Sequence, residues 1–222
     1  MADRGIEYKT RGELQAMRAS GVILARAIKV GLDTVAPGVT TGEVDAAVAA
    51  VIAEAGATSN FLHYGAHDGD SGFPATICAS VNDEVVHGIP GSRVLVEGDL
   101  LAIDAGCILD GWHSDSAVSV HVGAPPSMAE VDLLTATERA MWAGIAAAKA
   151  GGRLGDGGGA GAKRYARSAA CHALLAERRT PRALTRGHAP PCFGTLGAAR
   201  RRLHQEKDQC FGECSRDRRA MG

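Results

Sequence analysis

Residues 100–122, LLAIDAGCILDGWHSDSAVSVHV, decide the fold of this chain. The Asp-Gly pair at 110–111 lies between two runs of alternating apolar and polar residues, which is a strong signal for a two-residue β-hairpin turn. Such a turn pairs Leu109 with Trp112 and fixes the register of both strands. Because side chains alternate along a strand, one face of the hairpin is apolar and belongs to a core. Its members are Leu101, Ile103, Ala105, Cys107 and Leu109, with Trp112, Val118, Val120 and Val122 opposite.

The other face of the hairpin carries two carboxylates. In this register Asp104 pairs with Ala117, so Asp115 is its diagonal neighbour, at a Cβ separation of about 7–8 Å. Two carboxylates at this distance repel each other and raise each other's pKa unless a cation lies between them. No Lys or Arg lies on this face, so a hard or borderline metal ion is the simplest counter-charge. A solvated polar face is the alternative interpretation.

Two segments resemble a known family. DAGCILDGWHSD, residues 104–115, resembles the first metal-binding segment of type I methionine aminopeptidases, and FPATICASVNDEVVHGIP, residues 73–90, resembles the segment before it. The resemblance covers about residues 9–156. It implies an α+β fold, in which an antiparallel sheet backed by helices forms the first half of the pita-bread fold.

The resemblance also implies a site with two divalent metal ions, which could be Co, Mn, Fe, Zn or Ni. Asp104 and Asp115 are then metal ligands, and His87 is the catalytic residue that binds the substrate and helps to move a proton. Without the resemblance, a lone His after two valines is more often a core or turn residue. The substrate-binding residues implied are His87, Phe73, Cys78 and Tyr64.

By resemblance, the expected function is metal-dependent removal of the N-terminal methionine from nascent proteins in the cytoplasm, by a monomer and with the ribosome as a further partner. A non-enzymatic binding module on the same fold and a proline-specific relative are the alternatives. The net charge of −1 favours neither a nucleic-acid nor a membrane partner. The N-terminus is charged and lacks an apolar segment, so we predict no signal peptide, and no apolar run approaches the roughly 20 residues of a membrane span.

Periodicity and capping signals predict the remaining elements. We expect helices over 9–35, after Thr40 and after Ser127, strands over 59–64 and 75–81, and a loop over 64–72. In that loop, the acidic and His residues match no calcium-binding pattern. The expected inward face of the third helix is Val131, Leu134, Met141, Ile145 and Ala148. Cys78 and Cys107 fall in apolar strands and are expected to be reduced core residues.

The composition changes after residue 156. Residues 157–222 contain no Val or Ile, yet hold 14 of the 24 Lys+Arg and only 5 of the 25 Asp+Glu. We therefore expect residues 1–156 to be the half-domain and residues 157–222 to be an irregular basic tail, either a shifted reading frame or a disordered segment. The family's second half supplies one His and two Glu ligands, and we find no match for them. His188, Glu206 and Glu213 lack the family contexts, so we expect the activity of this chain to be impaired.

Overall fold

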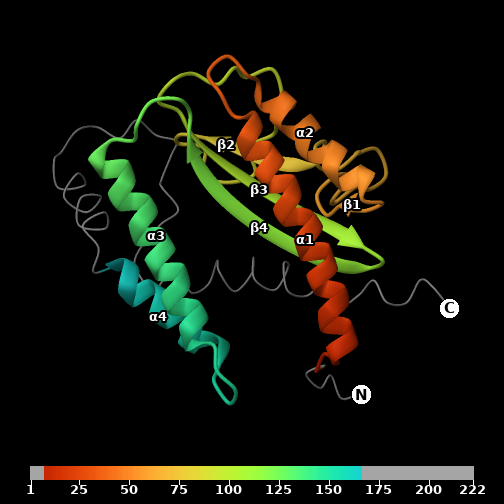
Figure 1. Cartoon of the computed structure of the whole chain (residues 1–222), viewed down its shortest axis with the longest axis vertical. Coiled ribbons are helices and arrows are strands. Elements are labelled where there is room, and N and C mark those ends of the chain that lie inside the picture. The colour runs from red at the N-terminus through yellow and green to blue at the C-terminus, as the bar shows by residue number, and fades with distance from the viewer. Residues whose placement is uncertain (1–7, 167–222) are drawn as a thin grey trace. The chain divides into compact units, whose positions relative to one another are not determined.

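The computed structural model describes residues 8–166 (Figure 1). Four helices and four strands make up this part of the chain. They are α1 (Arg11–Thr34), α2 (Thr41–Glu54), β1 (Thr58–Ser59), β2 (Ile77–Val81), β3 (Leu100–Leu109), β4 (Trp112–His121), α3 (Met128–Ala147) and α4 (Leu154–Ala166). None of the described helices is long and apolar enough to cross a membrane.

The four strands form one antiparallel sheet with β3 at its centre. β1 and β2 pair with β3 along one edge, and β4 pairs with β3 along the other. The predicted register is confirmed, because Leu109 pairs with Trp112 and Asp104 with Ala117. Both turn residues, at 110 and 111, have a positive φ, as a two-residue type I′ turn requires.

The apolar face of β3 packs against α1 and α2, which lie across that face of the sheet (Figure 1). Its predicted core residues Leu101, Ile103 and Cys107 are fully buried. Gly31 allows α1 to approach α2 closely, since a Cβ at this position would lie 2.8 Å from a methyl group of Val48. Because the helices cover the apolar face of β3, the opposite face, which carries Asp104, is the one they leave uncovered. Cys78 and Cys107 are both buried and free, as predicted.

α2 and α3 begin at the predicted capping boxes, and α1 begins at a third one that was not predicted. In each, an N-cap hydroxyl accepts a hydrogen bond from the third residue of the helix, whose Glu side chain accepts one from the N-cap backbone. These pairs are Thr10 with Glu13, Thr40 with Glu43 and Ser127 with Glu130.

The predicted strand over 59–64 is wrong beyond Ser59. The Ser59 hydroxyl accepts hydrogen bonds from the amides of Phe61 (3.0 Å) and Leu62 (3.2 Å), which closes a turn instead. His63 then adopts a φ of 65°, which no strand contains. The second predicted strand is confirmed but starts at Ile77, two residues later than expected.

The predicted inward face of the third helix is also wrong. Val131, Met141 and Ile145 are 36%, 52% and 53% exposed, and Ala148 is exposed as well. Within α3, Ala136 alone is buried. Helical spacing identifies residues that share a face, but it does not show what covers that face.

The structure corrects the expectation of irregular chain directly after residue 156, because α4 continues to Ala166. α4 packs against α3, and its glycines permit a close approach. A Cβ at Gly161 would lie 3.0 Å from the Ala140 carbonyl oxygen. Contact with α3 thus offsets the poor intrinsic helix propensity of glycine. The remaining residues of the predicted tail lie outside the described part of the chain.

Candidate functional site

The open face of the β3–β4 hairpin brings Asp104 and Asp115 together. Asp104 pairs with Ala117 and Gly106 with Asp115, so the two carboxylates are diagonal neighbours on one face. Partial burial, followed by the charge of Asp115, raises the pKa of Asp104. Loss of water around its carboxyl group raises the pKa of Asp115. The pair is thus an unneutralised acidic site that a divalent cation would stabilise.

Cys78 lies directly opposite Asp104 in the β2–β3 ladder and is buried. Burial, and then the charges of Asp104 and Asp115, raise the pKa of this thiol to about 11. The thiol therefore stays protonated at neutral pH, and a protonated thiol is a poor nucleophile and metal ligand. Its predicted role in substrate binding stays a prediction.

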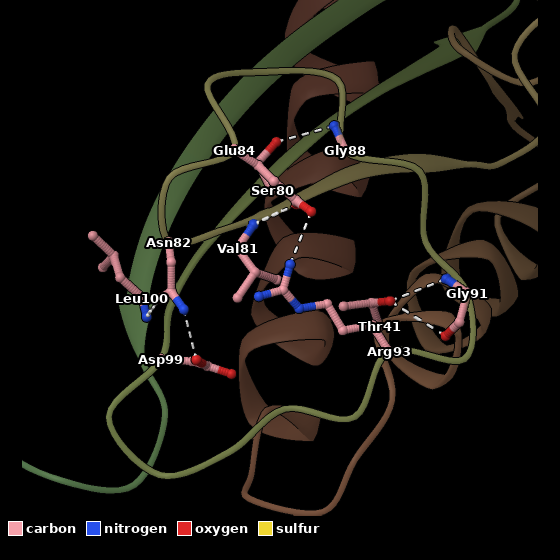
Figure 2. A network of polar contacts seen from close by, with 10 residues as sticks. All are labelled: Thr41, Ser80, Val81, Asn82, Glu84, Gly88, Gly91, Arg93, Asp99 and Leu100. Atoms are coloured by element: carbon pink, nitrogen blue, oxygen red, sulfur yellow. Dashed lines mark hydrogen bonds and ion pairs between the residues drawn. The ribbon is translucent and has the colours of Figure 1, made fainter. Parts of the chain in front are cut away.

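The loop after β2 is held by polar contacts (Figure 2). One carboxylate, that of Glu84, accepts a hydrogen bond from the Val81 amide (2.8 Å) and another from the Arg93 guanidinium (2.8 Å). The Gly88 amide donates to the Ser80 hydroxyl (3.1 Å). A Cβ at Gly88 would collide with the backbone of β2, so glycine is required there. These contacts determine the path of the loop between residues 82 and 93.

His87 lies in this loop with a φ of 60°, a conformation that is unfavourable for a residue with a side chain. Its side chain is exposed. A positive charge on this imidazole would lower the pKa of Asp104, against the larger effects of burial and of Asp115. The structure therefore brings Asp104 and Asp115 together on one face of the hairpin, and the role of His87 beside them stays a prediction.

The two predicted aromatic residues lie at the neck of the 64–72 loop. The His63 amide donates to the Phe73 carbonyl (2.7 Å), and the Phe73 amide to the Tyr64 carbonyl (3.0 Å). The Phe73 ring packs edge-to-face on Phe61, with 6.5 Å between ring centroids. Tyr64 is 59% exposed. Their role in substrate binding stays a prediction.

Sequence reasoning missed Asn60, which follows β1. Its side-chain nitrogen donates to the carbonyl of Ser114, the residue before Asp115. An Asn directly after a short strand, together with a glycine two residues beyond Asp104, was the available signal.

Within residues 8–166 no group of three or more His, Cys, Asp or Glu side chains is arranged to hold a metal ion. Two carboxylates are therefore the donor set that this part of the chain provides. The expected second-half ligands, and with them His188, Glu206 and Glu213, lie outside the described residues.

A prediction concerns Asp99, which anchors the start of β3 in the same network (Figure 2). Its carboxylate accepts hydrogen bonds from the Val96 amide (2.9 Å) and the Asn82 side chain (2.8 Å), and these lower its pKa from 3.8. We expect Asp99→Ala to reduce the free energy of unfolding by about 1–3 kcal/mol at neutral pH. Glu97→Ala, an exposed neighbour, is the control and should have little effect.

The sign of the pH dependence follows from the lowered pKa. The stabilisation by Asp99 is fully present above pH 3.8, the ordinary pKa, and is lost as the pH falls through the lower folded-state pKa. Urea denaturation at several pH values should show that the difference in the free energy of unfolding between the parent chain and Asp99→Ala decreases in acid. A difference in the free energy of unfolding that does not change with pH would contradict this account.

Comparison with known proteins places the chain in a family. The sequence profile of metallopeptidase family M24 matches residues 15–181. The chain belongs to metallopeptidase family M24. Methionine aminopeptidase 1 of Mycobacterium tuberculosis is 46% identical over 154 residues, which are 69% of this chain and 55% of the relative. Methionine aminopeptidase 1 of Bacillus subtilis is 41% identical over 150 residues, or 67% of this chain and 57% of the relative.

Solved M24 structures agree with this assignment. The crystal structure of methionine aminopeptidase from Rickettsia prowazekii matches with a TM-score of 0.59 and 34% identity, over 64% of this chain and 54% of that chain. Aminopeptidase P of Escherichia coli, at 17% identity and a TM-score of 0.53, shows the fold alone. The predicted α+β pita-bread fold is therefore confirmed. The chain spans little more than half the length of the curated relatives that it matches.

Proposed function

We propose that residues 8–166 carry the first half of the metal site of a methionine aminopeptidase, which removes the N-terminal methionine from nascent peptides in the cytoplasm. The observation that supports this most strongly is the diagonal placement of Asp104 and Asp115 on the open face of the sheet. The relatives from Mycobacterium tuberculosis and Bacillus subtilis are named methionine aminopeptidases, which supports the same choice of substrate.

The donor set fits the divalent metal ions that family M24 implies. Asp104 and Asp115 supply carboxylate oxygens with partial negative charge, and the raised pKa of each shows that the pair is under-solvated. Carboxylates accept Co, Mn, Fe, Zn or Ni, so this donor set does not select among them. Two such ions would supply Lewis acidity, which activates water and polarises the scissile carbonyl.

The other residues of this chain act on the peptide itself. His87, exposed on its loop beside Asp104, is placed to contact the substrate and to accept or donate a proton. The protonated thiol of Cys78 adds an apolar, uncharged surface next to the carboxylates. Phe73 and Tyr64 complete the proposed substrate-binding residues on the neighbouring loop.

We further propose that the 222-residue chain has impaired activity. Two carboxylates hold a transition metal poorly against water, and the described residues supply no more than these two as a cluster. The basic composition after residue 156 offers no recognisable substitute for the missing ligands. We propose that the basic composition of residues 157–222, the first ten of which belong to α4, results from a shifted reading frame.

The alternative functions have less support. The retained carboxylates and the nearby His87 argue against a purely non-enzymatic binding module. A proline-specific enzyme is supported only by structures such as the Xaa-Pro dipeptidase from Bacillus anthracis, which at 24% identity shows the fold alone.

The test is a chimera that joins residues 1–156 to the part of the Mycobacterium tuberculosis relative that follows the matched segment. With Mn²⁺ or Co²⁺, we expect the chimera to release methionine from Met-Ala-Ser and to leave Ala-Pro-Ser intact. The 222-residue chain, assayed in parallel, should release far less. Cleavage of Ala-Pro-Ser in preference to Met-Ala-Ser would refute the proposed substrate.

A further inference from the structure

The Asn60 side chain crosses the central strand on the side that carries the carboxylates. The Asn60 backbone amide donates to the Gly106 carbonyl on β3 (3.1 Å). Its side-chain Nδ2 continues over β3 and donates to the Ser114 carbonyl on β4 (3.1 Å). A single residue thus links the end of β1 to both strands of the hairpin.

Gly106 provides the room for this crossing. A Cβ at Gly106 would lie 2.6 Å from Nδ2 of Asn60 and 2.9 Å from its Cγ. The carboxamide therefore occupies the space that a side chain at position 106 would fill. Position 106 shares a face with Asp104, two residues away, and pairs directly with Asp115. The Asn60 carboxamide consequently lies over position 106, which neighbours both acidic positions in the register.

Two further observations favour a role in the site. Ser114 is held from the other side as well, because its hydroxyl lies 2.8 Å from the Ser20 hydroxyl of α1, so the residue before Asp115 is fixed by two separate elements. The Asn60 Oδ1 atom is buried and has no hydrogen-bond partner among the described residues. An unpaired buried acceptor costs about 1–3 kcal/mol of folding free energy. The stability of the fold alone therefore does not explain a carboxamide at position 60.

We propose that Asn60 is a positioning residue for the cation site: its carboxamide holds β4 at Ser114 and thereby fixes the Asp115 carboxylate opposite Gly106. β4 is an edge strand of the described sheet, so the Asn60 carboxamide adds a link across β3 to its pairing with β3 and its packing against α1. Residues that orient metal ligands typically change metal affinity by about 10–100-fold. This inference rests on the proposed role of Asp104 and Asp115 as metal ligands.

The test compares Mn²⁺ affinity among variants of the full 222-residue chain by electron paramagnetic resonance. We expect Asn60→Ala to weaken Mn²⁺ binding about 10-fold. The matched control is Ser59→Ala, since the Ser59 hydroxyl also anchors this segment, through Thr76 (2.9 Å), Phe61 and Leu62, but makes no hydrogen bond to β4 among the described residues. Ser59→Ala should lower the melting temperature and leave the Mn²⁺ affinity unchanged.

A second variant tests the same inference if Asn60→Ala fails to fold. Gly106→Ala removes no polar group but displaces the carboxamide, and it should weaken Mn²⁺ binding in the same way. The inference is overturned if Asn60→Ala and Ser59→Ala have the same Mn²⁺ affinity as the parent chain. If instead the parent chain and Asp104→Asn bind Mn²⁺ equally, the proposed cation site itself is refuted and the inference falls with it.

Discussion

Methionine release by the chimera is expected to fall at least about 10³-fold when Asp104 is replaced with Asn. Residues that merely orient a metal ligand contribute about 10–100-fold, so loss of a charged ligand should cost more. The amide keeps the size of the side chain but removes the charge that balances the metal ion. Asp115→Asn should behave alike, because both carboxylates lie on the same face of the hairpin.

The control for this prediction is Asp110→Asn. Asp110 lies in the turn of the same hairpin, is exposed, and has a φ of 49° that Asn also tolerates. Rates of methionine release at saturating Mn²⁺ should therefore match those of the unmodified chimera. Equal losses for Asp104→Asn and Asp110→Asn would show that the hairpin's stability, and not its open face, determines the activity.

Replacing Ile103 with Ala is expected to lower the free energy of unfolding by about 2–5 kcal/mol. Ile103 is fully buried on the face of β3 that packs against α1 and α2, so truncation leaves a cavity. The total stability of a small domain is about 5–15 kcal/mol, so this single change should leave a large unfolded population.

Ile108→Ala provides the matched control, since Ile108 lies on the same strand, on the opposite face, and is only partly buried. Urea denaturation followed by circular dichroism should show a much smaller loss for Ile108→Ala. Equal losses would mean that α1 and α2 do not cover the face of β3 that the structure assigns to them.

Local chemistry explains what the sequence predicted correctly. The Asp-Gly turn fixed the register of β3 and β4, and that register alone placed Asp104 and Asp115 on one face. The capping boxes located the starts of α2 and α3 to the residue, while the helical spacing alone placed the start of α1 two residues too early. Each of these signals is read from residues that lie close together in the chain.

One error was local, since the Ser59 hydroxyl closes a turn where a strand was predicted, and the other errors concern contacts between separate segments. The spacing of Val131 and Met141 identified a shared helical face, but it gave no partner for that face. The glycine-rich run of α4 predicted an irregular chain. In the structure these glycines allow α4 to pack closely against α3, and the sequence alone did not indicate that contact. Asn60 was overlooked for the same reason, since its role depends on a gap at Gly106 that only the folded sheet reveals.

Titration of the 222-residue chain with Mn²⁺, followed in amide nuclear magnetic resonance spectra, tests the cation site most directly. Paramagnetic broadening detects even weak binding and needs no second half of the site. The account predicts that the signals of residues 86–88, 103–105 and 114–116 broaden first, and that Asp104→Asn abolishes this pattern. Broadening that begins at other acidic residues, such as Asp68 and Asp70, while these three segments stay sharp would contradict it.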